Sequence, residues 1–326
     1  MSIAFVFPGQ GAQSVGMGRD LYEMSVAARV IFELADATLG FALTRLCFEG
    51  PEEALTATEN AQPALLTVSA ALLASMGELW GAGVNGRECQ ETITASYVAG
   101  HSLGEYSALV AAGAIDIPTA LRLVRRRGEL MSEAHDGVMA AIIGIDEAEL
   151  ERICRETSAE DAPVVIANYN SPGQLVISGA GTAVERACAL AKERGAKRAL
   201  PLKVSAAFHS PLMRDAAAGL AAALARAAIV DARTPVISNV TTEPLIQADA
   251  IRRELITQVT SPVRWIASVQ RMSAEGVDSF VEIGPGSVLT GLIKRLAPDA
   301  RLVNVSDLAS ARAFGEHSGV RSRNSE

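Results

Sequence analysis

The sequence predicts an α/β protein with two parts: a large α/β-hydrolase-like domain with a central, mostly parallel sheet, and a small ferredoxin-like domain inserted into it. Three observations support this fold class. Short apolar runs alternate with helix-like segments, as in parallel sheets. One such run ends at residues 100–104 in Gly-x-Ser-x-Gly, a pattern typical of a tight strand-to-helix turn. Residues 138–203 then follow the order strand-helix-strand-strand-helix-strand of a ferredoxin-like unit.

The chain of 326 residues is about twice as long as a typical domain. We expect the large domain to comprise residues 1–134 and 205–310, and the small domain to comprise residues 135–204. Residues 311–326 combine charged and small side chains, which predicts a flexible tail.

Composition disfavours several classes of protein. A net charge of −8 argues against nucleic-acid binding, which normally needs a basic surface. The four cysteines lie far apart without a CxxC pair, so we expect no metal site, no disulfides and a reducing, cytoplasmic setting. The uncharged stretch 60–77 contains polar residues, which favours a buried helix over a membrane span. We expect a monomer without a cofactor.

The first strand is predicted over Ile3–Phe7, because these residues are apolar and a glycine-rich loop follows them. This loop lacks the third glycine of a dinucleotide-binding fingerprint, since Ser14 stands in its place. A mostly helical region comes next, with a polar surface loop over 81–92 and a strand over 93–99.

The serine turn after that strand carries the first chemical signal. In a nucleophile elbow the serine occupies a strained turn, and glycines on both sides let the strand and helix backbones approach closely. Gly100 and Gly104 supply that room around Ser102. The free N–H groups and the dipole of the helix that begins there would favour an oxyanion. Ser102 is therefore the candidate nucleophile.

The next helix, predicted from Asp116 to about Glu133, contains three consecutive arginines that differ in their surroundings. At about 100° per residue, Arg125 and Arg126 fall on the polar side, whereas Arg127 falls within the apolar face. A buried guanidinium needs an anionic partner, which is either a carboxylate of the protein or a carboxylate of a substrate. From the residues alone, the internal ion pair is favoured, because structural ion pairs are common in proteins.

The remaining elements follow similar signals. In the small domain, strands are predicted over 138–144, 164–168, 174–178 and 197–203, and helices over 147–156 and 184–194. In the second half of the large domain, Ser210 and Pro211 begin an alanine-rich helix, and strands are predicted over 235–239 and 280–283. Residues 258–265 are predicted as a loop that enters a helix.

A serine nucleophile needs a base, and the chain has four histidines. His101 adjoins the serine in the turn, so its side chain should diverge from that of the serine. His135 lies in a polar turn and His317 in the predicted tail. His209 stands at a strand-to-helix boundary of the large domain, where a helix N-terminus favours the neutral imidazole. His209 is therefore the candidate base.

Six motifs occur in order along the chain. They are Phe-Pro-Gly-Gln-Gly-Ala-Gln (7–13), Gly-His-Ser-Leu-Gly-Glu-Tyr (100–106), Arg-Gly (127–128), Asn-Tyr-Asn-Ser-Pro-Gly-Gln (168–174), Phe-His-Ser-Pro-Leu-Met (208–213) and Glu-Ile-Gly-Pro-Gly (282–286). Together they resemble the malonyl-CoA:acyl-carrier-protein transacylase family. The resemblance implies that malonyl-CoA and an acyl carrier protein are the substrates. It also implies a ping-pong transfer through a malonyl-serine intermediate, in fatty-acid biosynthesis.

The resemblance implies a catalytic role for several residues. Ser102 would be acylated, with His209 as the general base. The backbone carbonyl of Gln258 would orient His209 and replace the acidic member of a triad. The backbone N–H groups of Gln10 and Leu103 would form the oxyanion hole.

The resemblance also implies how the substrates bind. Arg127 would hold the malonyl carboxylate as a bidentate pair, and the ring of Phe208 would crowd an α-methyl group. An acidic carrier protein would need a local basic patch near the pocket. Candidates for that patch are Arg125, Arg126, Lys192, Arg194, Lys197 and Arg198.

Two other functions remain open at the level of the sequence. A free-standing acyltransferase for a polyketide synthase would use the same chemistry with a different carrier. A thioester hydrolase or esterase could use the same serine turn, but an enzyme for neutral acyl groups has no need of a cation such as Arg127 in its pocket.

Overall fold

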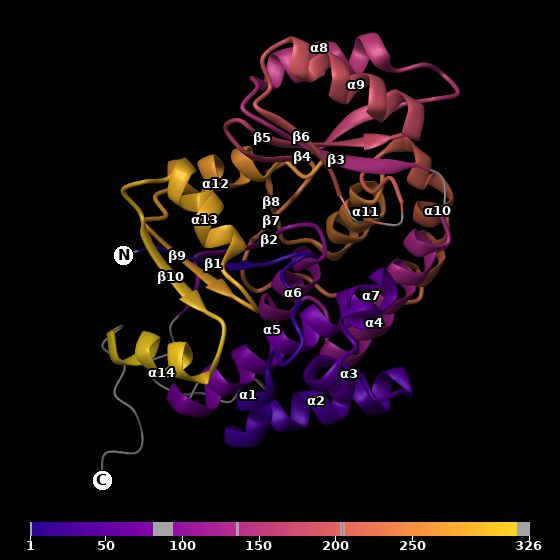
Figure 1. The fold of residues 1–326 in the computed structure, drawn as a ribbon. Helices are drawn as coiled ribbons and strands as arrows, with labels where there is room; N and C mark the ends of the chain where they lie inside the picture. The colour runs from indigo at the N-terminus through magenta and orange to yellow at the C-terminus, as the bar shows by residue number, and fades with distance from the viewer. Residues whose placement is uncertain (1, 81–93, 135–136, 203, 205, 318–326) are drawn as a thin grey trace.

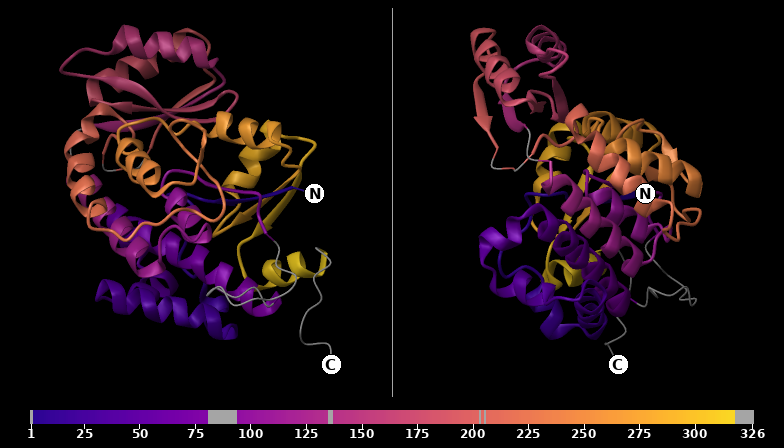
Figure 2. Two further views of the ribbon diagram at one scale, coloured as in Figure 1. Left: turned by 180° about the vertical axis from the view of Figure 1, so that it is seen from behind. Right: turned by 90° about the vertical axis from the view of Figure 1, so that its right-hand side faces the viewer.

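The structure is a computed structural model, and it describes residues 2–80, 94–134, 137–202, 204 and 206–317 (Figure 1). Two sheets organise the described residues. The small four-stranded sheet, with its two helices, stands at one end of the molecule, as both further views also show (Figure 2).

The larger sheet has six strands in the order β10-β9-β1-β2-β7-β8. These strands are β1 (Ile3–Phe7), β2 (Tyr97–Gly100), β7 (Val236–Ile237), β8 (Pro244–Leu245), β9 (Ser279–Ile283) and β10 (Arg301–Val305). Among them, β7 and β8 pair antiparallel and the other neighbours pair parallel. This mainly parallel sheet with helices confirms the predicted α/β class.

Both faces of the larger sheet are covered by apolar side chains. In β1, Phe5 and Phe7 join one apolar cluster, whereas Ala4 and Val6 join the cluster on the opposite face. Strands buried on both faces read as continuous apolar runs, which explains the composition of β1. The helices of the larger part are α1 (Arg19–Met24), α2 (Val26–Leu39), α3 (Leu43–Glu49), α4 (Glu52–Thr56), α5 (Thr58–Trp80), α6 (Gly104–Ala111), α7 (Ile117–Ser132), α10 (Arg214–Leu224), α11 (Ala248–Gln258), α12 (Trp265–Ala274), α13 (Val288–Leu296) and α14 (Leu308–His317).

The smaller sheet has four strands in the order β4-β5-β3-β6, and each pair of neighbours is antiparallel. Its elements are β3 (Val138–Ile143), α8 (Glu147–Thr157), β4 (Val164–Ser171), β5 (Gln174–Gly179), α9 (Gly181–Glu193) and β6 (Arg198–Pro201). Along the chain they follow the order predicted from the sequence. An apolar cluster of their own side chains holds sheet and helices together.

Three glycine-rich loops meet at one edge of the larger sheet, where β1, β2 and β9 end. A Cβ on Gly9 would lie 2.4 Å from the carbonyl oxygen of His101, and one on Gly284 would lie 2.5 Å from the ring of Pro8. Only glycine fits such approaches. Ligands of open α/β sheets bind outside the carboxyl ends of the strands, so this edge is where a site is expected.

Two sequence predictions need correction. The sequence predicts a loop at Gln258, but this residue is the last one of α11. Residues 311–317 of the predicted flexible tail belong to α14, where Ala311 and Phe314 are buried and Leu308 N donates to Asp20 Oδ2 at 2.8 Å.

Some predictions concern residues outside the described part of the chain. They are the polar loop over 81–92, His135, the side chain of His317 and the tail beyond it. None of the helices in the described ranges is long and apolar enough to cross a membrane.

Candidate active site

The serine turn connects the end of β2 at Gly100 to the start of α6 at Gly104. Ser102 adopts a φ of +52°, in the left-handed region that L-residues rarely occupy. A Cβ on Gly100 would lie 1.9 Å from the backbone carbon of Gly104, and one on Gly104 would lie 2.1 Å from the carbonyl oxygen of Phe7. The turn thus has the geometry of a nucleophile elbow, with the serine at its apex.

His209 lies beside this serine, with its Nε2 2.7 Å from Ser102 Oγ. The other ring nitrogen, Nδ1, lies 2.9 Å from the carbonyl oxygen of Gln258 and 3.1 Å from that of Ser261. Carbonyls only accept hydrogen bonds, so Nδ1 carries the proton and Nε2 is free to accept one. His209 also adopts a positive φ of +57°, so both members of the pair sit on strained backbone.

The imidazole of His209 is 3% exposed. Burial is the largest cause, and the nearby positive charge of Arg127 the second, of the lowering of the pKa of His209 to about 3. The neutral form, which can take a proton from Ser102, therefore dominates at physiological pH.

Arg127 is 2% exposed in α7, as the helix periodicity predicts. Its Nη1 donates to Gln62 Oε1 at 2.9 Å, and its Nη2 donates to Gln258 Oε1 at 2.9 Å and to Ser102 Oγ at 3.0 Å. Its Nε has no hydrogen-bond partner among the residues that the structure describes. No salt bridge in the described part of the chain involves Arg127, so the internal ion pair favoured from the residues alone is absent there. The guanidinium rests on neutral groups beside the nucleophile, and its charge is open to an anion.

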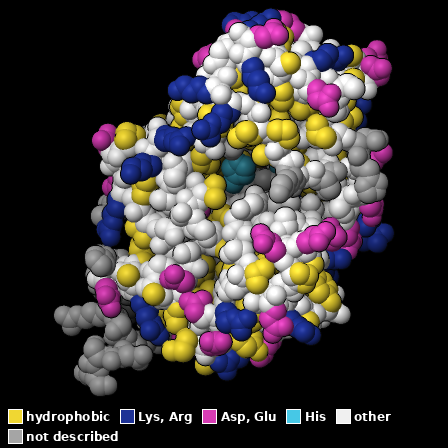
Figure 3. Space-filling model, in the orientation of Figure 1, with side chains coloured by type: hydrophobic (Ala, Val, Ile, Leu, Met, Phe, Trp, Pro, Cys, Tyr) yellow, Lys and Arg dark blue, Asp and Glu magenta, His cyan; other side chains and the backbone are white. Residues whose placement is uncertain are grey.

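A cavity of about 300 Å³ opens in front of these residues. Its lining includes Gln10, Ser102, Arg127, Phe208 and His209, with Leu202 and Val204 from the end of the small-domain segment. Figure 3 shows the opening as a hollow between the two parts of the molecule, with a histidine at its base. His209 and Arg127 both contact Ser102 Oγ, so polar groups converge there, as in sites that bind small molecules.

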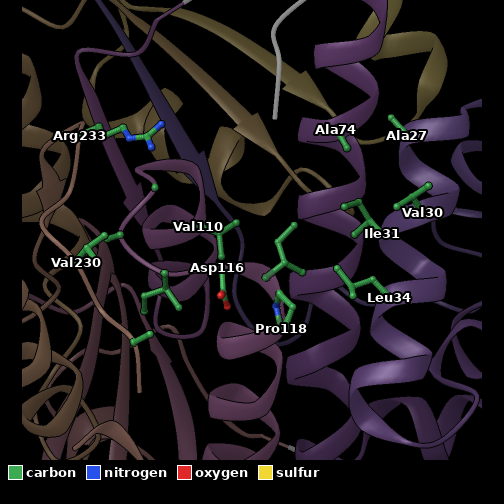
Figure 4. Close-up of a pocket in the computed structure, with 15 residues that line it drawn as sticks. Ala27, Val30, Ile31, Leu34, Ala74, Val110, Asp116, Pro118, Val230 and Arg233 are labelled. Carbon is green, nitrogen blue, oxygen red and sulfur yellow. The ribbon is translucent and has the colours of Figure 1, made fainter. Parts of the chain in front are cut away.

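A second, larger cavity of about 760 Å³ lies elsewhere, between α2, α5 and the start of α7 (Figure 4). Its lining is mostly aliphatic, with Asp116 and Arg233 as the charged members. Asp116 is engaged as the N-cap of α7. This cavity lacks a nucleophile with a base, so size alone does not identify the active site.

Two N–H groups near Ser102 are available for an oxyanion. Ser102 N donates to Asn239 Oδ1 at 2.7 Å and is therefore occupied. Within the described ranges, the N–H groups of Gln10 and Leu103 have no acceptor. Both residues line the cavity.

His101 diverges from the nucleophile, as expected. Its Nε2 lies 2.8 Å from Asn170 Oδ1, and its ring packs against Trp265 at 5.8 Å between centroids. It thus connects the serine turn to β4 of the small sheet.

Sequence reasoning missed several residues that hold the site. They are Gln62, Asn239, Ser261 and the side chain of Gln258, which contact Ser102, His209 or Arg127. These residues lie 25 or more positions from their partners along the chain, and no spacing rule relates them. Only the tertiary fold brings them together.

A serine at a strained strand-to-helix turn, hydrogen-bonded to a neutral histidine and near two N–H groups that have no acceptor among the described residues, is the arrangement expected for serine-dependent acyl-group chemistry. Comparison with known proteins is more specific. The chain belongs to the acyl transferase domain family, whose model matches residues 4–318.

Individual relatives agree with this assignment. The chain is 49% identical to the malonyl CoA-acyl carrier protein transacylase of Bacillus subtilis, over 94% of this chain and 93% of that protein. It is similar to the crystal structure of the acyl-carrier-protein S-malonyltransferase from Bartonella henselae, with a TM-score of 0.92 and 44% identity over 98% and 100% of the two chains. A malonyl-transacylase solved with a type II PKS acyl-carrier protein has a TM-score of 0.90 and 43% identity, over 97% and 100%.

Proposed function

We propose that this acyltransferase moves a malonyl group from malonyl-CoA to the phosphopantetheine thiol of an acyl carrier protein, in fatty-acid biosynthesis. Arg127 carries the proposal. It is a buried guanidinium without a carboxylate partner in the described residues, and it lies 3.0 Å from the candidate nucleophile. Such a cation selects an acyl group that bears its own negative charge. The names of the relatives described above support the same substrates.

In the first half-reaction, His209 Nε2 takes the proton of Ser102 while Oγ attacks the thioester carbonyl. The N–H groups of Gln10 and Leu103 stabilise the oxyanion. The C–S bond then breaks, the malonyl group stays on Ser102 as an ester, and His209 returns the proton to the CoA thiolate. Arg127 holds the malonyl carboxylate throughout.

In the second half-reaction, the carrier's thiol replaces CoA. His209 accepts its proton, the thiolate attacks the malonyl ester, and Ser102 leaves with the proton restored. Thioester and ester are close in free energy, so electrostatic stabilisation and the exclusion of water matter more than driving force. No cofactor is needed for this sequence of steps.

Selectivity among charged acyl groups would come from Phe208. Its ring lines the cavity and is 7% exposed, so it has little room to move away from an α-methyl group. A contact of this kind discriminates by about 1–3 kcal/mol.

The carrier protein would dock at the mouth of the cavity. Of the six basic candidates, Arg125, Arg126 and Arg194 form salt bridges with glutamates. Lys192, Lys197 and Arg198 are exposed and form no salt bridge in the described part of the chain. Figure 3 shows Lys and Arg side chains along the upper left rim of the hollow, and Asp and Glu below it. This polarity would orient an acidic carrier.

The finer features of the fold belong to the same proposal. We assign residues 135–204 to an inserted ferredoxin-like domain, supported by the antiparallel order β4-β5-β3-β6, and the remaining part to an α/β-hydrolase-like domain.

Cys47, Cys154 and Cys188 are free thiols, which favours the cytoplasm as the setting. We propose that the enzyme acts as a monomer, because one chain supplies the whole dyad.

A polyketide synthase carrier is the second candidate substrate. The observation in its favour is the similarity to the malonyl-transacylase solved with a type II PKS acyl-carrier protein. Comparing kcat/KM for a fatty-acid carrier and a polyketide carrier from the same source organism distinguishes the two, since the preferred carrier should be used more efficiently.

The proposed transfer is tested by incubating the protein with malonyl-CoA, with and without a phosphopantetheinylated carrier, and following both products by mass spectrometry. We expect malonyl-carrier to form and little free malonate to appear in its absence. Rapid release of malonate that the carrier does not divert would instead identify a thioester hydrolase.

A further inference from the structure

A pair of buried carboxyl groups lies behind the serine turn, and the proposed reaction does not use it. Glu105 is in α6, three residues after the nucleophile, and is 0% exposed; Glu254 is in α11 and is 6% exposed. Burial raises the pKa of both groups, and the negative charge of Glu254 raises the pKa of Glu105 further.

The two groups accept hydrogen bonds from different donors. Glu105 accepts three N–H groups: Asn239 N at 3.0 Å, Asn239 Nδ2 at 3.3 Å, and Gln258 Nε2. Glu254 accepts Val240 N at 3.0 Å. It is therefore Glu105 that contacts the two amide side chains next to the serine turn.

The two amides held by Glu105 both contact the nucleophile. Asn239 Oδ1 accepts from Ser102 N at 2.7 Å, and Gln258 Nε2 donates to Ser102 O at 3.0 Å. Backbone carbonyls also accept the amide nitrogens, since Asn239 Nδ2 donates to Gly100 O at 2.7 Å. Glu105 and these carbonyls accept only the nitrogen of each amide, so together they direct Asn239 Oδ1 toward Ser102 N and Gln258 Oε1 toward Arg127 Nη2, at 2.9 Å.

We propose that Glu105 is a positioning residue for acyl transfer. Together with the Gly100 and Ser102 carbonyls, it fixes the orientation of the Asn239 and Gln258 amides, which hold the Ser102 backbone and the Arg127 guanidinium. The Arg127 half of this inference rests on the proposed function, whereas the Ser102 half requires only that Ser102 is the nucleophile.

Two isosteric variants separate the roles of the pair. Glu105→Gln places an NH₂ group among N–H donors, so the amides lose their fixed orientation, and we expect Ser102 to react about tenfold or more slowly. Glu254→Gln keeps an oxygen for Val240 N and leaves Glu105 in contact with both amides, so we expect a rate within about threefold of the wild type.

Glu282→Gln is the matched control. Glu282 is 1% exposed, accepts the N–H groups of Leu289 and Thr290, and has no contact with Ser102, His209 or Arg127 among the described residues. Its variant should lower the melting temperature and leave the reactivity of Ser102 unchanged. It therefore reports what the loss of a buried carboxylate does to folding alone.

Reactivity is measured as the rate at which phenylmethylsulfonyl fluoride modifies Ser102, followed by intact mass, alongside the rate of acylation by malonyl-CoA. The sulfonyl fluoride carries no malonyl group, so this readout survives a failure of the proposed function. Slow sulfonylation of folded Glu105→Gln with near-normal Glu254→Gln supports the inference. A wild-type rate in Glu105→Gln, or a slower rate in Glu254→Gln than in Glu105→Gln, overturns it.

Discussion

At the scale of single residues, the unusual feature of the site is a buried guanidinium that forms no salt bridge with the described residues. The Nη atoms of Arg127 contact two neutral amides and a hydroxyl, and its Nε has no hydrogen-bond partner among those residues. The nearby Glu105 contacts the intervening Gln258 amide and not the guanidinium itself. An unpaired buried charge destabilises a folded protein, so such a residue persists where a ligand completes it. The carboxylate of a malonyl group fits that need.

Replacing Arg127 by alanine should therefore separate charged from neutral substrates. We expect Arg127→Ala to lose about 10- to 100-fold in kcat/KM with malonyl-CoA, because a charge-assisted hydrogen bond contributes about 1.5–3 kcal/mol. Transfer from acetyl-CoA should change much less. Measuring both rates on one preparation corrects for any loss of folded protein, and an equal loss of both would mean that Arg127 is structural.

Sequence reasoning at this scale works where the chemistry is local. Helix periodicity placed Arg127 on an apolar face, and flanking glycines placed Ser102 in a strained turn; both inferences need only neighbouring residues. Asn239 and Ser261 could not be found in this way, since their roles arise from contacts with residues far along the chain.

At the scale of elements, the serine turn depends on close packing between β1, β2 and α6. Gly104 begins α6 directly against the end of β1. The sequence predicts this strand-turn-helix because its glycines and apolar run are contiguous. It does not predict α11, because two of the four buried positions of that helix are the polar residues Glu254 and Gln258.

Alanine substitutions at two glycines test this packing. Gly104→Ala should destabilise the fold strongly, because the new Cβ would meet the Phe7 carbonyl at 2.1 Å. Gly291→Ala is the control: it lies within α13 with nothing within 4 Å of the new Cβ, so it should stabilise by about 0.5–1 kcal/mol. Urea denaturation of both variants gives the comparison, and similar stability for the two would refute the role of close approach.

At the scale of the whole molecule, the site lies where the two parts of the chain meet. The larger part supplies Ser102, His209 and Arg127, and Asn168 of β4 lines the same cavity. The order of strands in each sheet could not be read from the sequence, because pairing depends on contacts across the chain. Enclosure by both parts also buries His209, and this burial links catalysis to stability.

That link predicts how stability depends on pH. An unfolded histidine binds a proton below about pH 6.5, whereas the pKa of folded His209 is about 3. The unfolded state therefore binds more protons between these values, so this group lowers the free energy of unfolding as pH falls below 6.5 and has no effect above it. The slope of the unfolding free energy against pH is proportional to the number of protons taken up on unfolding. In His209→Gln this number should fall by up to one within this window, so the slope should be shallower. Denaturation curves across the window check this, and identical slopes would show that His209 is not buried as the neutral base.

The central claim is that Ser102 carries the malonyl group between two thiols. Intact-mass measurement after brief incubation with malonyl-CoA tests it most directly. The wild-type protein should gain the mass of one malonyl group, located on Ser102 by peptide mapping, and Ser102→Ala should gain none. Absence of the adduct from the wild-type protein, or its persistence in Ser102→Ala, would contradict the account.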